Sequence, residues 1–239
     1  PVVFLIMVLL VQGQALINEF YCFSNDCHGG AGNYFISILV EQEAPQWLPA
    51  EHKIGIDLGI ADFAITTNDA GESVKYANPK CLYQSEKKVK KAQRALSRKQ
   101  KGSKNRDKAR LVLAKKYEKI ANQRKHFLHK LSNKITDENQ VIVIETLSSR
   151  NLMKNHKLAK AIGDVSWFEF SRQLTYKAEW KGRMLIKADR FYPSSQICSA
   201  CGHRDGKKAP HIRDWKCPDC GTHHDRDINA SKNLLALAK

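Results

Sequence analysis

The chain has 239 residues and a formal net charge of +16, from 40 lysine and arginine residues against 24 aspartate and glutamate residues. This length suits one α/β domain of ordinary size with a small satellite, and the excess of positive charge favours a polyanionic partner. The charge is unevenly placed, because no lysine or arginine precedes Lys53. The apolar run at 1–11 lacks a basic flank and is too short to cross a bilayer as a helix, so we expect neither export nor a membrane partner.

Residues 1–32 show no clear hydrophobic period, so we leave them unassigned; the apolar run within them suits a buried strand or a segment outside the functional fold. The first residue is Pro rather than Met, and we therefore expect the chain to be a fragment. Residues 33–41 combine β-branched and aromatic side chains, which predicts a strand. A proline-containing link at 44–50 separates this strand from the next element.

The segment 53–60 is a short apolar strand with one carboxylate, Asp57. In a strand, Ile54, Ile56 and Leu58 face one way, while Asp57 and its neighbouring glycines face the other way. A glycine-flanked face would let a metal ion or a phosphate backbone approach Asp57 closely. A turn-forming aspartate at a strand end explains the same residue, so this stretch alone leaves both interpretations open.

Other regular elements are predicted on either side of this strand. Strands at 63–67 and 73–76 are joined by a turn of Asn, Asp and Gly, which indicates an antiparallel hairpin. An amphipathic helix is predicted at 164–182, with its aromatic residues in the core, and a strand at 184–188 follows it.

Residues 80–134 differ from the rest in charge, because they hold roughly half of the chain's 40 basic residues. Their pattern predicts a helical hairpin interrupted at Gly102 and Ser103. Its second arm carries an apolar stripe of Leu111, Ala114, Tyr117, Ala121 and Leu128. Like charges one turn apart repel unless a polyanion neutralises them, so we favour contact with nucleic-acid phosphates over a merely solvated face. The expected contact residues are Lys87, Lys88, Lys91, Arg94, Arg98, Lys101 and Lys104.

The segment 140–145 is an apolar strand that ends in Glu145. A fully apolar run of this length suits a central strand that is covered on both faces. A carboxylate at the end of a buried strand is costly unless it is paired or bound to a metal ion. Glu145 is therefore a candidate ligand.

Two Cys-x-x-Cys motifs lie about fifteen residues apart, a spacing with which two tight turns supply four thiolates to one zinc ion. Their members are Cys198, Cys201, Cys217 and Cys220. Paired disulfides would need an oxidising compartment, which nothing else in the chain supports. His203, His223 or His224 could replace one cysteine, but four thiolates are already present and we expect the histidines to be surface or substrate-facing residues. A closed four-thiolate site holds a structural ion, so the chemistry must lie elsewhere.

The three remaining cysteines are Cys22, Cys27 and Cys81. They lack metal-site spacing, and we interpret them as free thiols in a reducing cytosol. A second metal site formed by Cys22 and Cys27 with His28 is a weaker alternative.

A third acid, Asp227, begins a short apolar-periodic helix after the second cysteine motif. Taken alone, an aspartate at this place is most often only a helix N-cap. Together, Asp57, Glu145 and Asp227 occupy the three places where an RNase H-like fold brings acids to one edge of its sheet. Clustered carboxylates repel, and their natural counter-ions are hard divalent cations such as Mg²⁺. Two such ions can activate a water molecule and stabilise the leaving oxygen in phosphodiester hydrolysis.

At this point the sequence resembles the TnpB (OrfB) family of transposon-encoded RNA-guided DNA endonucleases, relatives of the type V CRISPR effectors. The matching segments are Ile54-Gly-Ile-Asp57-Leu-Gly59, Val143-Ile-Glu145, Ser166-Trp167-Phe-Glu-Phe170, Tyr176-Lys-Ala-Glu-Trp180, Phe191-Tyr-Pro-Ser-Ser-Gln-Ile-Cys198, the two cysteine motifs, and Asp225-Arg-Asp-Ile-Asn-Ala230. The resemblance runs from about residue 33 to the end of the chain. It implies a RuvC-like nuclease with a mixed sheet, a basic helical hairpin insertion and a zinc ribbon placed before the last acidic helix.

Carried over residue by residue, the resemblance assigns Asp57, Glu145 and Asp227 as catalytic acids that bind magnesium, and Cys198, Cys201, Cys217 and Cys220 as zinc ligands. Asp225 is a near competitor, but the family pattern of Asp followed two residues later by Asn selects Asp227. The basic hairpin would lie along the duplex of guide RNA and target DNA.

The resemblance also divides the chain. The expected parts are 1–32 as a segment unlike the family, 33–52 as a residual strand of an N-terminal barrel plus a linker, 53–193 and 222–239 as the nuclease core with 80–134 inserted, and 194–221 as the zinc ribbon. The resemblance further implies that full-length relatives carry an N-terminal half that grips the guide RNA, and we expect this chain to lack that half.

The leading prediction is therefore the catalytic half of an RNA-guided, metal-dependent DNA endonuclease that acts in a prokaryotic cytoplasm at the nucleoid. An alternative is a catalytically inactive remnant that still binds DNA or RNA. A DDE-type transposase shares the acidic fold, but the ribbon directly before Asp227 argues against it.

Overall fold

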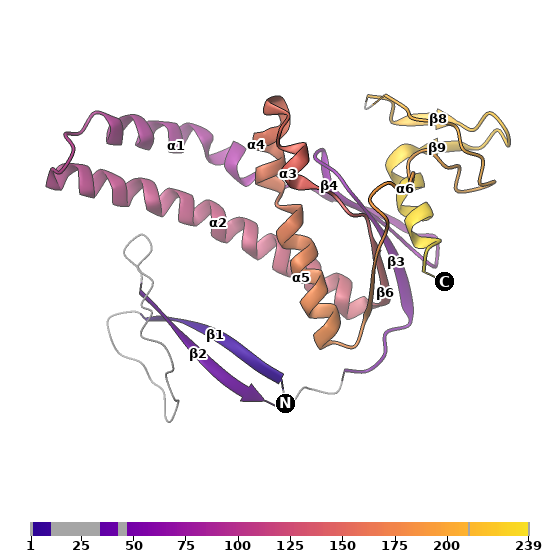
Figure 1. Cartoon of the computed structure of the whole chain (residues 1–239), viewed down its shortest axis with the longest axis horizontal. Helices are drawn as coiled ribbons and strands as arrows, with labels where there is room; N and C mark the ends of the chain where they lie inside the picture. The colour runs from indigo at the N-terminus through magenta and orange to yellow at the C-terminus, as the bar shows by residue number, and fades with distance from the viewer. Residues whose placement is uncertain (1, 11–33, 43–46, 210, 239) are drawn as a thin grey trace. The chain divides into compact units, whose positions relative to one another are not determined.

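Figure 1 shows a computed structural model of the chain, which describes residues 2–10, 34–42, 47–209 and 211–238. The chain divides into two compact units. One unit contains residues 1–46 and 81–125, and the other contains residues 47–80 and 126–239. No helix among the described residues is long and apolar enough to cross a membrane.

The first unit contains a two-stranded antiparallel sheet of β1 (Val2–Leu10) and β2 (Tyr34–Gln42). The register runs from the pair Val2 and Gln42 to the pair Leu10 and Tyr34. The strand predicted at 33–41 is confirmed, and the apolar run at the start of the chain is a strand too. Cys22, Cys27 and His28, the weaker alternative metal site, lie outside the described residues.

The first unit also contains the predicted helical hairpin. α1 (Cys81–Ser97) and the first part of α2 (Lys104–Glu138) run side by side and are joined by a turn (Figure 1). The predicted break is confirmed at Gly102, whose φ of +80° is readily adopted only by glycine. The two arms pack through buried Cys81, Val89 and Ile120.

The apolar stripe predicted for the second arm is partly wrong. Leu111, Tyr117 and Ala121 are exposed, whereas Leu113 and Ile120 pack against α1. Several apolar positions were compatible with a helical period, and only the position of α1 selected the residues that are covered.

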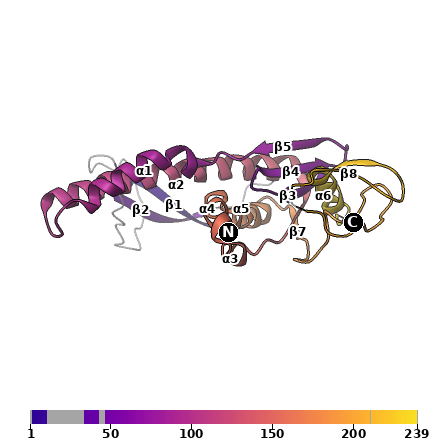
Figure 2. The ribbon, with the colours of Figure 1, turned by 90° about the horizontal axis from the view of Figure 1, so that it is seen from above.

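The second unit is built on a five-stranded mixed sheet in the order β5-β4-β3-β6-β7, and Figure 2 shows it from a second direction. Its strands are β3 (His52–Leu58), β4 (Asp62–Asn68), β5 (Ser73–Ala77), β6 (Asn139–Ile144) and β7 (Met184–Lys187). The first three are antiparallel neighbours, whereas β6 runs parallel to both β3 and β7. The predicted hairpin and the central position of the Glu145 strand are confirmed.

The remaining helices are α3 (Ser149–Leu152), α4 (His156–Val165), α5 (Trp167–Trp180) and α6 (Arg226–Leu235). The helix predicted from residue 164 is wrong at its start, because α4 ends at Val165 and a new helix begins at Trp167. Ser166, with φ +60° and ψ +45°, forms the break. A left-handed serine is rare, and the apolar period continues through it, so periodicity alone joined the two helices.

Helices cover both faces of this sheet. On one face Ile54, Ile56 and Leu58 pack against Phe170 and Leu174 of α5 and against the C-terminal part of α2. On the other face Val143 packs against Leu234 of α6. The alternation predicted for β3 is therefore confirmed, and its Asp57 side lies on the α6 face. A short hairpin of β8 (Asp214–Lys216) and β9 (His223–Asp225) leads directly into α6.

Candidate functional site

Asp57, Glu145 and Asp227 line one cavity of about 380 Å³ in the second unit. Asp57 lies near the end of β3, and Glu145 follows the last residue of β6. These strands are parallel neighbours with Ile56 opposite Ile144, so both carboxylates emerge at the same edge of the sheet. Asp227 comes from the first turn of α6. The structure thus brings together the three acids that the sequence analysis singled out.

Glycine at position 55 lets α6 lie directly on β3. A Cβ atom added to Gly55 would overlap the carbonyl oxygen of Ser231 and come within 2.5 Å of the Leu235 nitrogen. A hydrogen bond of 2.6 Å between the hydroxyls of Thr67 and Ser231 also fastens the helix to the sheet. The sequence analysis interpreted the glycines around Asp57 as room for a ligand; for Gly55 this is wrong, because the helix that carries Asp227 occupies the space.

Asp225 and Asp227 have different tasks. Asp225 is the N-cap of α6, and its Oδ1 accepts hydrogen bonds of 3.0 Å from the backbone nitrogens of Asp227 and Ile228. It also forms an ion pair of 2.6 Å with Lys75. Asp227 does not cap the helix, and the carboxylate of Asp227 lines the cavity.

The cavity is unfavourable for uncompensated negative charge. Burial raises the pKa of Asp57 well above its ordinary value, and the nearby charges of Glu145 and Asp227 add to the effect. Burial raises the pKa of Glu145 to about 7, although the backbone N–H of Leu58, which donates to Glu145 Oε1 at 2.7 Å, opposes the rise. Such a site favours either protons or a bound cation.

One arginine forms hydrogen bonds with a carboxylate of this cavity. Nη1 of Arg213 donates to both oxygens of Asp227, at 2.9 and 2.7 Å. Arg213 precedes β8 in the segment between the two cysteine motifs, and Arg226 follows the N-cap of α6. Both arginines lower the pKa of Asp57, though less than burial raises it. The sequence analysis missed Arg213, because nothing local distinguishes it from the many other basic residues.

The rest of the cavity wall is mixed in character. Ile60, Leu147, Leu152 and Trp167 make an apolar part, and Ser194 and Ser195 add hydroxyl groups. A cavity lined by carboxylates and by apolar side chains can hold a substrate that has both a charged and an uncharged part.

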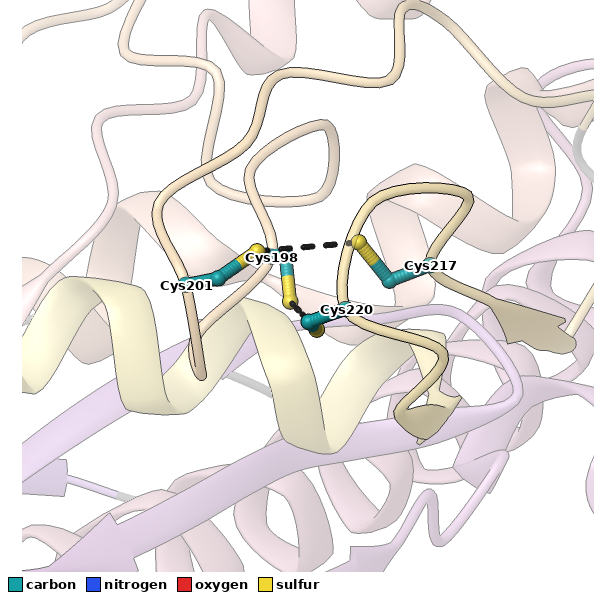
Figure 3. Close-up of side chains that lie close together, drawn as sticks. All are labelled: Cys198, Cys201, Cys217 and Cys220. Atoms are coloured by element: carbon teal, nitrogen blue, oxygen red, sulfur yellow. Dashed lines mark hydrogen bonds between the residues drawn. The ribbon is translucent and has the colours of Figure 1, made fainter.

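The four predicted zinc ligands also lie together, as Figure 3 shows. The sulfur atoms of Cys198, Cys201, Cys217 and Cys220 are all within 4.8 Å of one another. Two of the separations, Cys198 to Cys220 and Cys201 to Cys217, are 3.7 Å. Four sulfurs at the usual Zn–S distance of about 2.3 Å lie roughly 3.8 Å apart at the corners of a tetrahedron, so the thiols fit a zinc ion.

One histidine of β9 contacts this cluster. Nε2 of His224 lies 3.0 Å from the sulfur of Cys198, and its ring packs on Trp215 with centroids 4.8 Å apart. The expectation that all three histidines are surface or substrate-facing is therefore wrong for His224, while His203 and His223 are exposed. Backbone pairing of Trp215 with His224 across β8 and β9 places the ring there.

The basic residues expected to contact nucleic acid lie on α1, in the turn after it and at the start of α2. All seven side chains are exposed: Lys87, Lys88, Lys91, Arg94, Arg98, Lys101 and Lys104. They are in the first unit, whereas the three acids are in the second.

Comparison with known proteins identifies the family. The OrfB_IS605 family profile, described as a probable transposase, matches residues 37–156, which is half of the chain. The chain belongs to the OrfB (TnpB) family. The resemblance found in the sequence motifs is thereby confirmed. A second profile, that of the Cas12f1-like TNB domain, matches residues 167–234 of this OrfB protein.

Curated relatives carry a common description. A putative RNA-guided DNA endonuclease of Streptomyces pristinaespiralis is 46% identical over 206 residues, which are 86% of this chain and 50% of the relative. A putative RNA-guided DNA endonuclease of Escherichia coli K12 is 29% identical over 221 residues, covering 86% of this chain and 54% of the relative. The chain therefore spans about half the length of these relatives.

Solved structures share the fold. A cryo-EM structure of a Cas12f1–sgRNA–target DNA complex matches with a TM-score of 0.56 at 17% identity, covering 88% of this chain and 55% of the other. A Cas12f ternary complex matches with a TM-score of 0.58 at 19% identity, covering 85% and 42%. The mixed α/β fold of this OrfB protein is thus similar to that of Cas12f.

Proposed function

We propose that this chain carries the nuclease centre of an RNA-guided DNA endonuclease, and that Asp57, Glu145 and Asp227 bind divalent cations for the hydrolysis of a DNA phosphodiester bond. The observation that carries the proposal is the meeting of three carboxylates, from β3, β6 and α6, in one cavity. Two of them have raised pKa values, caused by burial and by their mutual repulsion. In this proposal the mixed sheet, with acids from β3, from the end of β6 and from α6, is RuvC-like.

The residues fit magnesium by the chemistry of their donors, since hard divalent cations prefer carboxylate oxygens. When bound there, magnesium would polarise the scissile phosphate and activate a water molecule. The protein orients the carboxylates. The backbone N–H of Leu58 donates a hydrogen bond to Oε1 of Glu145, which leaves Oε2 for the cation. Arg213 holds both oxygens of Asp227, so cation binding at Asp227 requires that these two hydrogen bonds be shared or broken.

The zinc ribbon has a structural role in this proposal, because four thiolates leave no open coordination position. Hydrogen bonds with the side chain and the backbone of Thr222 lower the pKa of Cys220 to about 6, and a metal ligand requires the thiolate form. The exposed basic hairpin would bind the phosphates of guide RNA and target DNA. The family and the descriptions of the curated relatives favour a nuclease over an inactive remnant.

The test is nicking of single-stranded and duplex DNA by the purified chain with Mg²⁺ or Mn²⁺. We expect Asp57→Ala and Asp227→Ala each to reduce the rate by about a hundredfold or more, as the loss of a metal-binding carboxylate does. Asp69→Ala is the control, because it changes an exposed carboxylate of the same unit that pairs with His52 and does not line the cavity. Equal losses in all three variants, or DNA binding without cleavage in the unchanged chain, would favour a binding remnant.

A further inference from the structure

Asn229 holds the zinc ligand Cys198 from both sides. Its side-chain Oδ1 accepts a hydrogen bond of 2.9 Å from the backbone nitrogen of Ser199. Its Nδ2 donates a hydrogen bond of 2.7 Å to the carbonyl oxygen of Ile197. Asn229 is only 1% exposed, so one buried amide joins both chain neighbours of Cys198 to α6.

Asn233, one turn further along α6, extends this attachment. Its Nδ2 donates at 2.7 Å to the carbonyl oxygens of Ser194 and Ile197, and Ser194 lines the acidic cavity. The two asparagines therefore fasten the segment 194–199, which leads into the first cysteine motif, along one side of α6.

The second cysteine motif reaches the same helical turn by another route. β8 directly precedes Cys217, and it pairs with β9 so that Asp214 lies opposite Asp225. Asp225 is the N-cap of α6, and the backbone nitrogen of Arg226 donates to the carbonyl oxygen of Arg213 at 2.7 Å. The start of α6 is thus held between the two motifs that a zinc ion would connect.

The two ends of α6 differ in what holds them. Its C-terminal half packs on the sheet through Leu234 and through the hydroxyl contact between Ser231 and Thr67, in addition to the hydrogen bonds of Asn233 to the segment 194–199. Its first turn, which carries Asp227, is held mainly by ribbon residues. A change in the ribbon should therefore act on the first turn while the rest of the helix stays in place.

We propose that Asn229 is a positioning residue for Asp227, which couples the zinc ribbon to the acidic cavity by holding the first turn of α6 to Cys198. The ribbon would then control the geometry of the site as well as the local fold. The hydrogen bonds of Asn229 are observed whether or not the chain is a nuclease. Their effect on a reaction rests on the proposed nuclease function.

The first experiment measures hydrogen exchange of the backbone amides of residues 226–228 in the whole chain, with excess zinc and after chelation. In the unchanged chain we expect zinc removal to accelerate exchange by about tenfold or more, since several hydrogen bonds of about 1 kcal/mol each depend on the ribbon. Zinc-loaded Asn229→Ala should already exchange at the fast rate and should respond little to chelation. Amides of residues 233–235 should stay protected in every case.

Two further variants sharpen the test. Asn229→Asp keeps the acceptor for Ser199 and loses the donor to Ile197, so it should give a smaller acceleration in the same direction. Asn139→Ala is the matched control: Asn139 is 4% exposed and donates at 2.9 Å to the carbonyl oxygen of Ile135, away from the ribbon. It should lose stability yet keep slow, zinc-dependent exchange at 226–228. Slow exchange in zinc-loaded Asn229→Ala, or the same acceleration in the control, would overturn the proposal.

A second readout separates this inference from the proposed function. Binding of Mn²⁺, followed by electron paramagnetic resonance, should weaken in the unchanged chain on zinc removal and in Asn229→Ala with zinc present. If hydrogen exchange at 226–228 changes as expected but Mn²⁺ does not bind at all, the positioning role of Asn229 is supported and the proposed metal-dependent nuclease site is refuted. If Mn²⁺ binds equally in all forms and hydrogen exchange does not change, the positioning role is refuted and the proposed metal site is supported.

Discussion

One nitrogen of Arg213, Nη1, lies within 2.9 Å of both carboxylate oxygens of Asp227. The two residues are fourteen positions apart, on opposite sides of the second cysteine motif. Arg213 is about half exposed, whereas Asp227 is mostly buried. A half-exposed guanidinium group from the ribbon therefore contacts the acid that α6 contributes to the cavity.

Replacing Arg213 by Ala should shift the pH dependence of nicking. Arg213 lowers the pKa of Asp57, so its loss raises that pKa and strengthens the competition of protons with the metal ion. The acidic limb of the pH–rate profile should move to higher pH, so that the rate at pH 6, relative to the variant's own rate at its plateau, falls by about fivefold, as suits a half-exposed ion pair worth about 1 kcal/mol or less.

Arg213→Lys should restore much of the activity, because a single nitrogen makes both contacts. Arg204→Ala, which removes another exposed arginine of the ribbon, is the control and should leave the profile unchanged. An unchanged profile in Arg213→Ala would show that its charge does not act on the cavity.

Magnesium should stabilise the chain more at pH 8 than at pH 5. The pKa of Glu145 rises from an ordinary value of 4.5 to about 7 in the folded chain. The folded state without metal therefore binds a proton more tightly than the unfolded state, which favours folding fully below pH 4.5, and this advantage is lost as the pH rises through about 7. Above that pH a divalent cation can replace the proton and stabilise the folded state.

Thermal unfolding with and without Mg²⁺ at both pH values measures this effect. Glu145→Gln is the matched variant, because it keeps an acceptor for the N–H of Leu58 and removes the charge. It should flatten the pH dependence and reduce the increase of Tm with Mg²⁺. The same increase of Tm at pH 5 and pH 8 would argue against cation binding at these carboxylates.

Gly55→Ala should disrupt both the fold and the site. The added methyl group would meet backbone atoms of Ser231 and Leu235, which cannot move unless α6 moves with them. We expect a loss of about 2 kcal/mol or more in the free energy of unfolding. Nicking should fall further than stability explains, since Asp227 would move with the helix.

Gly163→Ala is the control for this substitution. Gly163 lies within α4 and has nothing within 4 Å of an added Cβ atom, so alanine there should stabilise the chain by about 0.5–1 kcal/mol. Urea denaturation measures both changes. Similar stability for Gly55→Ala and the unchanged chain would mean that α6 does not need its close approach to β3.

Neutralising the basic hairpin should weaken nucleic-acid binding without abolishing zinc binding. Replacing Lys87, Lys88 and Lys91 by Gln removes three exposed charges from α1. The logarithm of the nucleic-acid binding constant decreases linearly with the logarithm of the salt concentration. The steepness of this decrease should be reduced by about 0.7 to 0.9 for each phosphate contact that is lost.

Fluorescence anisotropy with labelled RNA and DNA at several salt concentrations measures this slope. Lys154, Lys157 and Lys160, on and beside α4, offer a control set of equal charge. Equal effects of the two triple variants would mean that net charge alone binds the nucleic acid.

Local sequence determined the secondary-structure elements and the four-cysteine cluster. The two Cys-x-x-Cys motifs predicted this cluster because each pair forms within one tight turn, whose spacing hardly depends on the rest of the fold. The strands that carry Asp57 and Glu145 were predictable from short apolar runs. The hairpin break at Gly102 was predictable because few residues other than glycine adopt its conformation.

The tertiary structure decided the relationships between distant segments. Only the parallel pairing of β3 with β6 and the packing of α6 on Gly55 brought the three acids into one cavity. Three further relationships also needed the fold. They are the capping role of Asp225, the contact of Arg213 with Asp227, and the hydrogen bonds of Asn229 to the residues on either side of Cys198. The break at Ser166 and the covered positions of α2 were not predictable from periodicity, because a hydrophobic period records which residues can be buried, and only the neighbouring elements determine which ones are.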